Sequence, residues 1–600
     1  MAWLLDGGVL LAYFLTVISI GLYKGRGDKT MEGFAVGNRS IPWWAVLASI
    51  LAAEISAATF LGAPDEGYVS RNYTYAQLAI GTLLARVVVA FVFIKPYYDF
   101  RVVSIYEFLR VRFGERTKNG ASAVFLITRA LASGTRLYVA AVVLVLGYET
   151  FSGVALAPLQ QVWIYIASLV FLTAATAIYT ALGGIKAVVW TDVIQAMVMF
   201  GSLAFAIWSL LHAIPDGWQG AMALLNAPKD MIFFDSGTEP NASFLENVRK
   251  VLGTEYTLWA ALFGSTFITM ATHGTDQDMV QRMLTAKNAT KSRLALILSG
   301  LADLPIVLCF LTIGILLWAF YQKQEMPHPF AYYILHEMPP GVRGLMIAGI
   351  FATAMGSLST ALNALATSFT QDWYLAYIRP GAAPQHVVTA ARKTTVVFSA
   401  ILVVIGSATA YAAIVLHSRV IPIVLGIFGY TYGSLLGVFL VGMLTKTRGS
   451  EKGNLVAMAC GFVAVSFLSG LHNDLWNLLH PSDPDFLTWM ARHPRGPAFQ
   501  HWKWDWLPTI DFPWRITAGT LVTAAVALIF RTPPRARESK HSTSCKACPQ
   551  PPVSVIPTPD LHSYARFAEK KTPFPVTPLT TLAGLTAFVQ RFVSRPFRSH

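Results

Sequence analysis

Charged residues are scarce in this 600-residue sequence. Asp, Glu, Lys and Arg make up only 13% of the chain, against 54% hydrophobic residues, and the mean hydropathy is +0.51. An ordinary soluble domain carries about twice that fraction of charge, so the composition excludes a soluble globular protein. The scarcity of charge instead predicts a protein that lies in a lipid bilayer.

Cysteine is also rare, with four residues in the whole chain. Cys309 and Cys460 lie in apolar runs, and Cys545 and Cys548 lie near the C-terminus. Four such scattered residues exclude the disulfide framework of a small secreted protein. Cys545-Lys-Ala-Cys548 has the spacing of half a zinc site or of a redox pair, but no second pair accompanies it, so we do not expect a metal to bind there.

Long apolar runs, by contrast, recur along the chain. A helix needs about 20 residues to cross a 30 Å hydrocarbon core, and about thirteen runs reach this length. The first run lacks the basic segment and the small-residue cleavage site of a signal peptide, so we predict that it is retained. The fold class is therefore an all-α integral membrane protein, with predicted spans at residues 3–23, 42–64, 73–98, 121–148, 158–182, 186–212, 254–275, 291–321, 343–371, 394–417, 420–444, 452–471 and 514–531.

The net charge of +14 would indicate nucleic acid as a partner in a soluble protein, but its distribution favours a membrane topology and no nucleic acid. About eight of these charges lie in the tail from Arg531 onward, and most others lie in every second loop. Arg282 and Lys287, for example, are placed in the loop after the seventh span. Because cytoplasmic loops carry the excess Lys and Arg, we predict an external N-terminus and a cytoplasmic C-terminus in a multi-pass protein of the cell (inner) membrane.

The spans fall into two blocks of five, residues 42–212 and 254–444. An odd number of spans per block means that the second block starts from the opposite side, so the two blocks are inverted repeats. Residues 1–41 precede them as an N-terminal helix and first cytoplasmic loop. Residues 445–531 follow as two peripheral helices with a long external loop, and residues 532–600 form a basic tail that is predicted to be mostly disordered.

Polar residues inside spans mark candidate sites, because they are costly when they face lipid. The segment LAAEISAATFLGAP contains Glu54, Ser56 and Thr59, and the segment ALFGSTFITMATHGTDQ contains Thr269 and His273. These segments open the two inverted blocks. Polar, interrupted helices at corresponding positions of two such halves indicate a transporter substrate site. Close helix packing through small residues is the alternative.

A third segment, GIFATAMGSLSTALNALATSFTQDW, is apolar but rich in hydroxyls. Thr353, Ser357 and Thr360 share one helical face, and Ser359 lies on the neighbouring stripe. Oxygen ligands with one carboxylate suit a small hard cation, and Asp192 in TALGGIKAVVWTDVIQ is a candidate carboxylate. Each hydroxyl alone is also compatible with a hydrogen bond to a carbonyl of its own helix.

At this point the sequence resembles the sodium:solute symporters, a family that includes sodium/glucose, iodide, proline, monocarboxylate and sialic acid cotransporters. The resemblance covers about residues 1–450 and rests on FAVGNRSIPWW, SIYEFLRVRFG, GGIKAVVWTDVIQ, DQDMVQRMLTAKN and MGSLSTALNALATSFTQDWY. It implies the LeuT-type fold of five plus five helices in an inverted repeat.

The resemblance also implies two sodium sites. The principal site lies between the first core helix and the ninth span, and Gly356 departs there from the usual Ser, which removes one oxygen ligand. The second site uses Asp192. The implied ligands are Ala52, Ile55, Thr353, Gly356 and Ser357 for the principal site and Asp192, Ser359 and Thr360 for the second.

For the substrate, the resemblance implies a pocket lined by both interrupted helices and by the fourth and eleventh spans. Arg136 lies midway along its span and suits a bidentate clamp on a carboxylate. Glu54 replaces a neutral amide of the sugar carriers, so it is compatible with proton coupling, with a cationic substrate, or with a structural ion pair to Arg86 or Arg129. The candidate substrate ligands are Glu54, Ser56, Thr59, Arg136, Thr269, His273, Tyr430 and Tyr432.

The expected function is sodium-coupled import of a small organic solute, a sugar, a sialic acid or a carboxylate, by alternating access. The expected partners are the substrate, Na+ and the lipid bilayer, with Na+ as the coupling ion and no other cofactor. A polytopic membrane enzyme such as a lipid-linked transferase is the main alternative, but the longest loops hold no compact catalytic set, so we expect no enzyme. A sensor and a channel are further alternatives.

Overall fold

The computed structural model describes residues 2–25, 29–153, 156–225, 230–415 without 323, 325 and 327, 426–471 and 510–532. Over these ranges the chain is helical, apart from loops and two isolated β-bridges, Ile41 with Ala286 and Arg448 with Arg531. Most of the predicted external loop before the last span, and nearly all of the basic tail with Cys545 and Cys548, lie outside the described residues.

Within the described ranges, ten helical stretches are long and apolar enough to cross a membrane, and a bent pair raises the number to eleven. The count of thirteen stays a prediction. The long helices are α1 (Ala2–Lys24), α5 (Leu78–Val92) continuing into α6 (Ile94–Asp99), α8 (Glu115–Ser152), α9 (Pro158–Ala213), α14 (Ala289–Phe320), α16 (Val342–Phe369), α17 (Pro384–Ile414), α19 (Ile427–Leu444), α20 (Glu451–Leu468) and α23 (Phe512–Ile529). Shorter helices are α2 (Met31–Val36), α7 (Tyr106–Phe113), α10 (Gly217–Ala223), α11 (Phe244–Leu252) and α15 (Pro329–His336).

Helix α9 is too long for one span, because 56 residues at 1.5 Å each extend about 84 Å. Its backbone leaves the helical conformation at Gly184, where φ is 56° and ψ is −154°. A Cβ at this position would lie 2.7 Å from the carbonyl oxygen of Phe34, so glycine meets both the dihedral and the steric demand. The two halves of α9 correspond to the predicted spans 158–182 and 186–212.

The first interrupted helix is broken where the sequence predicts it. Helix α3 (Trp43–Glu54) ends at Ile55, which is extended with ψ of 97°, and α4 (Ala57–Ser70) starts after Ser56 with a bend of 65°. The Ser56 hydroxyl accepts a hydrogen bond from the backbone N–H of Thr59 at 3.4 Å, as an N-cap residue does. The break therefore follows from a cap residue in the middle of an apolar run.

The second interrupted helix is broken near the end of its predicted segment. The π-helical turn η3 (Ala260–Ser265) runs directly into α12 (Thr266–Gly274), so the polar residues from Gly264 to His273 lie within a continuous helix. The chain breaks instead at Thr275, and Asp276 caps the short helix α13 (Gln277–Met283) by accepting from the N–H of Asp278 at 2.9 Å. A π-helical turn absorbs the small-residue stretch without ending the helix.

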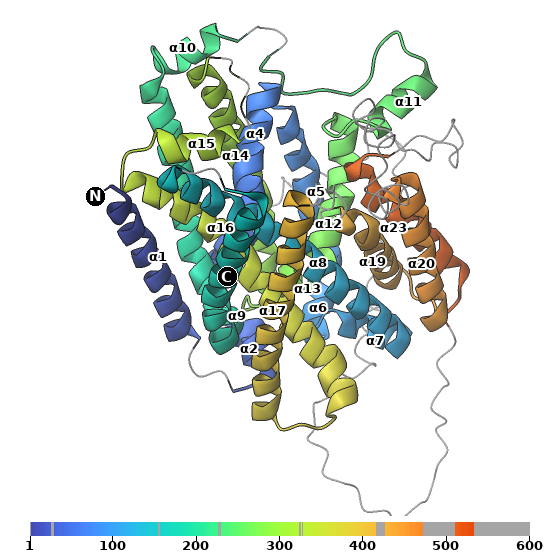
Figure 1. Cartoon of the computed structure of the whole chain (residues 1–600). Helices are drawn as coiled ribbons and strands as arrows, with labels where there is room; N and C mark the ends of the chain where they lie inside the picture. Colours follow the sequence, from blue (N-terminus) through green and yellow to red (C-terminus); the bar gives the residue numbers. More distant parts are fainter. Residues whose placement is uncertain are drawn as a thin grey trace, which may run out of the picture. The chain divides into compact units, whose positions relative to one another are not determined.

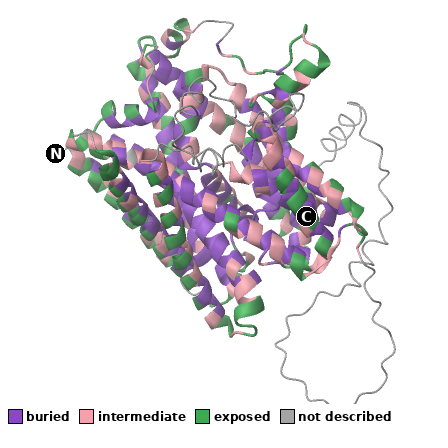
Figure 2. Cartoon of the chain, turned by 45° about the vertical axis from the view of Figure 1, so that its right-hand side comes forward, coloured by how far each residue is buried: buried purple, intermediate pink, exposed green. Residues whose placement is uncertain are grey.

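Helix α16 occupies the interior of the bundle. It is buried along nearly its whole length and packs against α1, α3, α8, α9 and α17. Figure 1 shows α1 at one edge of the bundle and the group of α19, α20 and α23 at the other, with α9 and α16 between them. Figure 2 shows the buried residues inside the bundle and exposed residues along its outer faces. Among those outer residues, Leu4 of α1 is 79% exposed and Val404 of α17 is 66% exposed, as suits contact with lipid.

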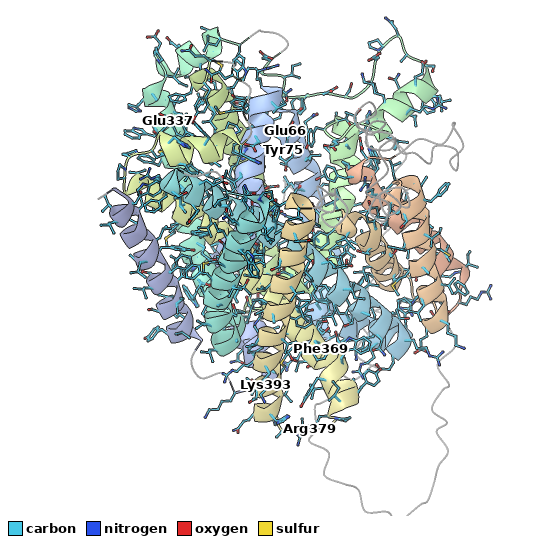
Figure 3. The ribbon with its side chains drawn as sticks, in the orientation of Figure 1. Glu66, Tyr75, Glu337, Phe369, Arg379 and Lys393 are labelled. Atoms are coloured by element: carbon cyan, nitrogen blue, oxygen red, sulfur yellow. The ribbon has the colours of Figure 1, made fainter. Side chains whose placement is uncertain are left out.

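The ends of the bundle differ in charge. Arg379 and Lys393 lie at the lower end in Figure 3, whereas Glu66 and Glu337 lie toward the upper end. Arg379 and Lys393 are two of the loop cations from which the topology was predicted, and the orientation in the membrane stays a prediction. One of the cations used for that topology was misplaced, however, because Arg282 is fully buried on α13 and is not in a loop. Every residue of α13 is buried, so the chain continues inside the protein beyond the break at Thr275.

Candidate functional site

A cavity of about 170 Å³ lies at the break between α3 and α4. Side chains of α8, α12, α16 and the start of α19 complete its wall. Four of the eight predicted substrate ligands line it, together with one predicted sodium ligand: Glu54, Ser56, Arg136, His273 and Ser357. The structure thus brings together residues that are up to about 300 positions apart in the sequence.

The other four predicted substrate ligands do not line this cavity. Thr59 lies in the first turn of α4 and donates its backbone N–H to the cap residue Ser56. Thr269 is buried on α12. Tyr430 accepts a hydrogen bond from Arg515 of α23 at 3.2 Å and packs with Val465. Tyr432 donates to Asp276 at 2.7 Å and so lies behind the wall, where it fixes a carboxylate that does line the cavity.

Glu54 forms an ion pair with Arg86, as one of the sequence interpretations proposed. The Arg86 guanidinium is completely buried, and it also donates to the Ser299 hydroxyl at 3.0 Å. The other Glu54 oxygen, Oε2, is buried without a hydrogen-bond partner among the described residues. His273 Nε2 lies 3.9 Å from Glu54 Oε1 and also has no hydrogen-bond partner there.

Arg136 differs from the other cations near the cavity. Its guanidinium lies over the ring of Phe428 at 4.9 Å from the centroid, and it forms no ion pair with a carboxylate in the described part of the chain. Arg129, about two turns away on α8, pairs instead with Asp276 at 3.2 Å and with Asp278. The cavity therefore contains one cation whose charge no nearby anion neutralises directly.

The hydroxyls of α16 donate hydrogen bonds to carbonyls of their own helix. Thr353 donates to Ile350 at 2.8 Å, Ser357 to Ala354 at 3.1 Å, and Ser359 and Thr360 both to Gly356. This local bonding uses the hydroxyl hydrogen and leaves oxygen lone pairs free. The hydroxyls therefore remain able to ligate a cation.

Gly356 is the point at which α16 meets the end of α3. A Cβ built on Gly356 would lie 3.1 Å from the carbonyl oxygen of Ala52 and 3.1 Å from Oε1 of Gln195. The structure thus brings the predicted sodium ligands Ala52 and Gly356 together, next to Ser357 on the cavity wall. Ile55 and Thr353 are buried close to the same break. This set of backbone and hydroxyl oxygens fits the oxygen preference of a hard cation.

Gln195 is a residue that sequence reasoning missed. It is 1% exposed, and neither atom of its amide reaches hydrogen-bonding geometry with a described residue. The tyrosines Tyr13 and Tyr179 are polar neighbours of this amide. The signal in the sequence is its spacing, since Gln195 follows Asp192 by three residues and therefore lies on the same face of α9.

The Asp192 carboxylate already has hydrogen-bond partners within the protein. Its Oδ2 accepts from Ser49 at 2.6 Å and from Arg282 at 2.7 Å, and all three side chains are buried. Its Oδ1 has no hydrogen-bond partner among the described residues. Sequence reasoning missed Arg282 and Ser49, although the i, i+4 spacing of Asp278 and Arg282 on α13 is a signal for a buried ion-pair network.

The two broken helices meet a hydroxyl-bearing helix around a small polar cavity inside a bundle of spans. This arrangement is typical of a membrane carrier. Comparison with known proteins makes the class specific. The model of the sodium:solute symporter family matches residues 34–461, and the chain belongs to this family. The resemblance inferred from the motifs is thereby confirmed.

Several characterised relatives share about a quarter of their residues with the chain. The sodium/sialic acid symporter SiaT of Proteus mirabilis is 26% identical over 76% of this chain and 88% of its own length. The human sodium-coupled monocarboxylate transporter 1 is 25% identical over 85% of this chain and 84% of its own length. The human sodium/iodide cotransporter is 26% identical over 74% of this chain and 66% of its own length.

Among solved structures, a substrate-bound, outward-open Na+-coupled sialic acid symporter superposes with a TM-score of 0.68. It is 22% identical in sequence, and the match covers 88% of this chain and 97% of the other. The two chains therefore share a fold, which confirms the prediction of an all-helical, LeuT-type fold. Family and fold are those of transporters, and no comparison supports the alternative of a lipid-linked transferase.

Proposed function

We propose that this chain is a sodium-coupled symporter that imports a small organic carboxylate by alternating access, with Arg136 as the clamp for the carboxylate. The observation that carries this proposal is the position of Arg136, which lines the cavity and pairs with no described carboxylate. A cation inside a membrane protein is costly unless an anion joins it, so a substrate carboxylate supplies the missing partner.

The geometry of the clamp supports an anion rather than a neutral sugar. Because Phe428 covers one face of the guanidinium, the N–H groups at its edge remain available for a bidentate contact. Two of the relatives named above are carriers for sialic acid and for monocarboxylates, which are organic acids.

For the coupling ion we propose the two sodium sites that the motifs imply. Ala52, Ile55, Thr353, Gly356 and Ser357 form the principal site at the α3 break, and Asp192, Ser359 and Thr360 form the second. One Na+ that moves down a potential of 100 mV supplies about 2.3 kcal/mol before its concentration gradient is added. We further propose an external N-terminus, a cytoplasmic C-terminus, and repeats at residues 42–212 and 254–444.

The test is uptake into proteoliposomes that contain the purified full chain. We expect uptake of radiolabelled lactate or propionate with a sodium gradient, faster uptake with the interior negative, and none with a potassium gradient. This pattern separates a carrier from a channel, a sensor and an enzyme. Uptake that is unaffected by replacing sodium with potassium would refute the proposal.

The clamp is tested by Arg136→Gln. Loss of the bidentate contact should lower apparent affinity for the carboxylate at least about 30-fold, since a charged hydrogen bond contributes about 2 kcal/mol. Arg110→Gln is the matched control, because Arg110 is half-exposed and pairs with Glu107 at the protein surface. Equal uptake by both variants would remove Arg136 from the substrate site.

A further inference from the structure

A non-helical segment binds the end of the first broken helix that lies away from the cavity. Residues 230–237, which we call the strap, lie between α10 and α11, and Figure 1 shows this connection above the upper ends of α4 and α5. The N–H of Met231 donates to the Arg71 carbonyl at 2.9 Å, and Oδ1 of Asp230 accepts from Nε of Arg71 at 3.3 Å. The strap is thereby fixed to the residue that caps the end of α4.

The backbone at this contact has an unusual conformation. Arg71 has a φ of 53° and Met231 has a φ of 66°, in the left-handed region that residues other than glycine rarely adopt. Tyr73 adds a further bond, since its N–H donates to the Ile232 carbonyl at 2.8 Å. Backbone in a disfavoured conformation persists only where the surrounding contacts hold it, and it gathers at functional sites. This end of the strap is therefore a candidate for a functional role.

Gln77 joins the strap to the second broken helix. It is completely buried and ends the short helix η2 (Thr74–Gln77) before α5. Its Oε1 accepts from the N–H of Asp235 in the strap at 3.2 Å, and its Nε2 donates to the Tyr256 carbonyl at 3.4 Å. The Asp235 carbonyl in turn accepts from the N–H of Leu258 at 2.7 Å, just before η3. One side-chain amide therefore holds the start of α5, the strap and the entry to η3 together.

The two helices that the strap joins reach the cavity at their other ends. Helix α4 begins at Ala57, which lines the cavity, and ends at the strap. The turn η3 begins near the strap and continues into α12, whose residues Thr272 and His273 line the cavity. Within the bundle α4 packs mainly against α14, whereas η3 packs against α5 and α23. The strap thus links two cavity-lining helices at their far ends.

We propose that the strap and Gln77 make α4 and the continuous helix of η3 and α12 move as one unit when ligands bind at their cavity ends. Hydrogen bonds fix the spacing of the far ends, so a displacement of either helix passes to the other through a contiguous set of contacts. Gln77 does not line the cavity, so it acts as a positioning residue. The inference goes beyond the proposed function, because it concerns the motion of the two helices and holds for any solute that the carrier binds.

The experiment measures the distance between two spin labels on the purified full chain, in sodium chloride and in potassium chloride. The labels are attached to cysteines at Val69, near the end of α4, and at Glu255, before η3, after the native cysteines are replaced by serine. Both positions are exposed, so the labels do not disturb the packing. With the native strap we expect one narrow distance distribution that is the same in both salts.

Gln77→Met removes the amide at nearly the same side-chain length. Segments that lose their hydrogen bonds sample more conformations, so the distribution should become at least about 1.5 times as wide. If the chain also shows the proposed uptake, turnover should fall about fivefold with KM within about twofold, because gate closure sets turnover in many proteins and Gln77 does not touch the solute. The distances need no substrate, so they test the strap even if the proposed function fails.

Arg71→Gln is the second variant, and it removes the ion pair with Asp230 at the other end of the strap while Gln77 stays in place. It should widen the distribution less than Gln77→Met, and it decides alone if Gln77→Met does not fold. Lys250→Gln is the matched control, since Lys250 pairs with Glu239 at 2.6 Å in the same connection but beyond the strap. A native-strap distance that changes between the two salts, wild-type distributions in the strap variants, or an equal widening in the control each overturns the inference.

Discussion

The two broken helices of this carrier are held in different ways. At the first break, between α3 and α4, a hydroxyl cap at 3.4 Å and one ion pair to Arg86 hold the chain, and Glu54, Ser56 and Ala57 open onto the cavity. At the second break, between α12 and α13, the two carboxylates Asp276 and Asp278 bind Arg129, and Asp278 also lies 3.9 Å from Arg282. Both breaks thus present residues to the cavity, but the second break is held by more ion pairs than the first.

This difference assigns a role to each break. Alternating access needs one part of the site that rearranges when ligands bind and another that keeps its shape. The ion-pair network of α8, α9 and α13 is almost completely buried, although Arg129 and Asp276 also line the cavity, and its several ion pairs give a rigid reference. Buried polar atoms without a hydrogen-bond partner occur at both breaks among the described residues, but the α3 break is held by a single ion pair, so ligand binding can change more there.

The largest expected effect comes from the centre of the rigid network. Arg282→Met should leave Asp192 without its ion-pair partner, while Asp278 keeps Arg129, and should destabilise the fold by about 3–5 kcal/mol. The measurement is the yield and thermal unfolding of the purified chain in detergent. Arg293→Met, at a half-buried arginine that donates to the Ala90 carbonyl at 2.7 Å, is the control with a smaller loss. A normal unfolding temperature for Arg282→Met would mean that the second break does not depend on this network.

The contrast between the breaks also shows what the sequence could predict. Apolar runs predicted the spans, because backbone groups in lipid must be hydrogen-bonded within the segment and a helix achieves this. The cap residue Ser56 marked the first break. The second break falls inside the predicted segment, but the sequence did not place it at Thr275, because a π-helical turn keeps Gly264 and Ser265 within a continuous helix. No local signal distinguishes such a turn from a break, since the packing of η3 against α5 and α23 decides it.

The residues of the candidate site, like the helix breaks, were predicted only in part. The family resemblance selected Glu54, Ser56, Arg136, His273 and Ser357 as site residues, and all five line one cavity. Arg282 was mistaken for a loop cation, because charge alone does not reveal that α13 is buried inside the bundle. Tyr430 was predicted to line the pocket, but its side chain contacts α23, and contacts between distant helices are not readable from spacing along one helix.

A medium effect should come from Gly356, where the first break meets α16. Gly356→Ala adds a Cβ at 3.1 Å from both the Ala52 carbonyl and Gln195, so we expect a loss of about 1 kcal/mol and weaker sodium activation of uptake. Gly356→Ser adds the same Cβ together with a hydroxyl, so it should bind sodium more tightly than Gly356→Ala. The half-saturating sodium concentration for uptake measures both. If the two variants have the same value, position 356 contributes no ligand.

Gly62→Ala is the matched control for this pair. Gly62 lies on α4, and a Cβ there would meet no atom within 4 Å. Alanine also has a higher helix propensity than glycine, so this variant should keep or slightly raise stability without changing sodium activation. A change in sodium activation for Gly62→Ala as large as that for Gly356→Ala would show that the effect comes from helix rigidity and not from contact with Ala52.

The smallest expected effect is a dependence of stability on pH at α4, the second half of the first broken helix. Asp65 of α4 lies 3.2 Å from Nδ1 of His328, in the connection between α14 and α15, and this hydrogen bond raises the pKa of His328 above its ordinary value of 6.5. Because the folded pKa is the higher one, the pair stabilises the fold fully below about pH 6.5 and loses this contribution as the pH rises through the raised value. The His328 side chain is 57% exposed, so the contribution is at most about 0.5 kcal/mol. The unfolding temperature of the wild-type chain should therefore fall slightly more between pH 6 and pH 8 than that of His328→Gln, and parallel curves would show that α4 is not held by this pair.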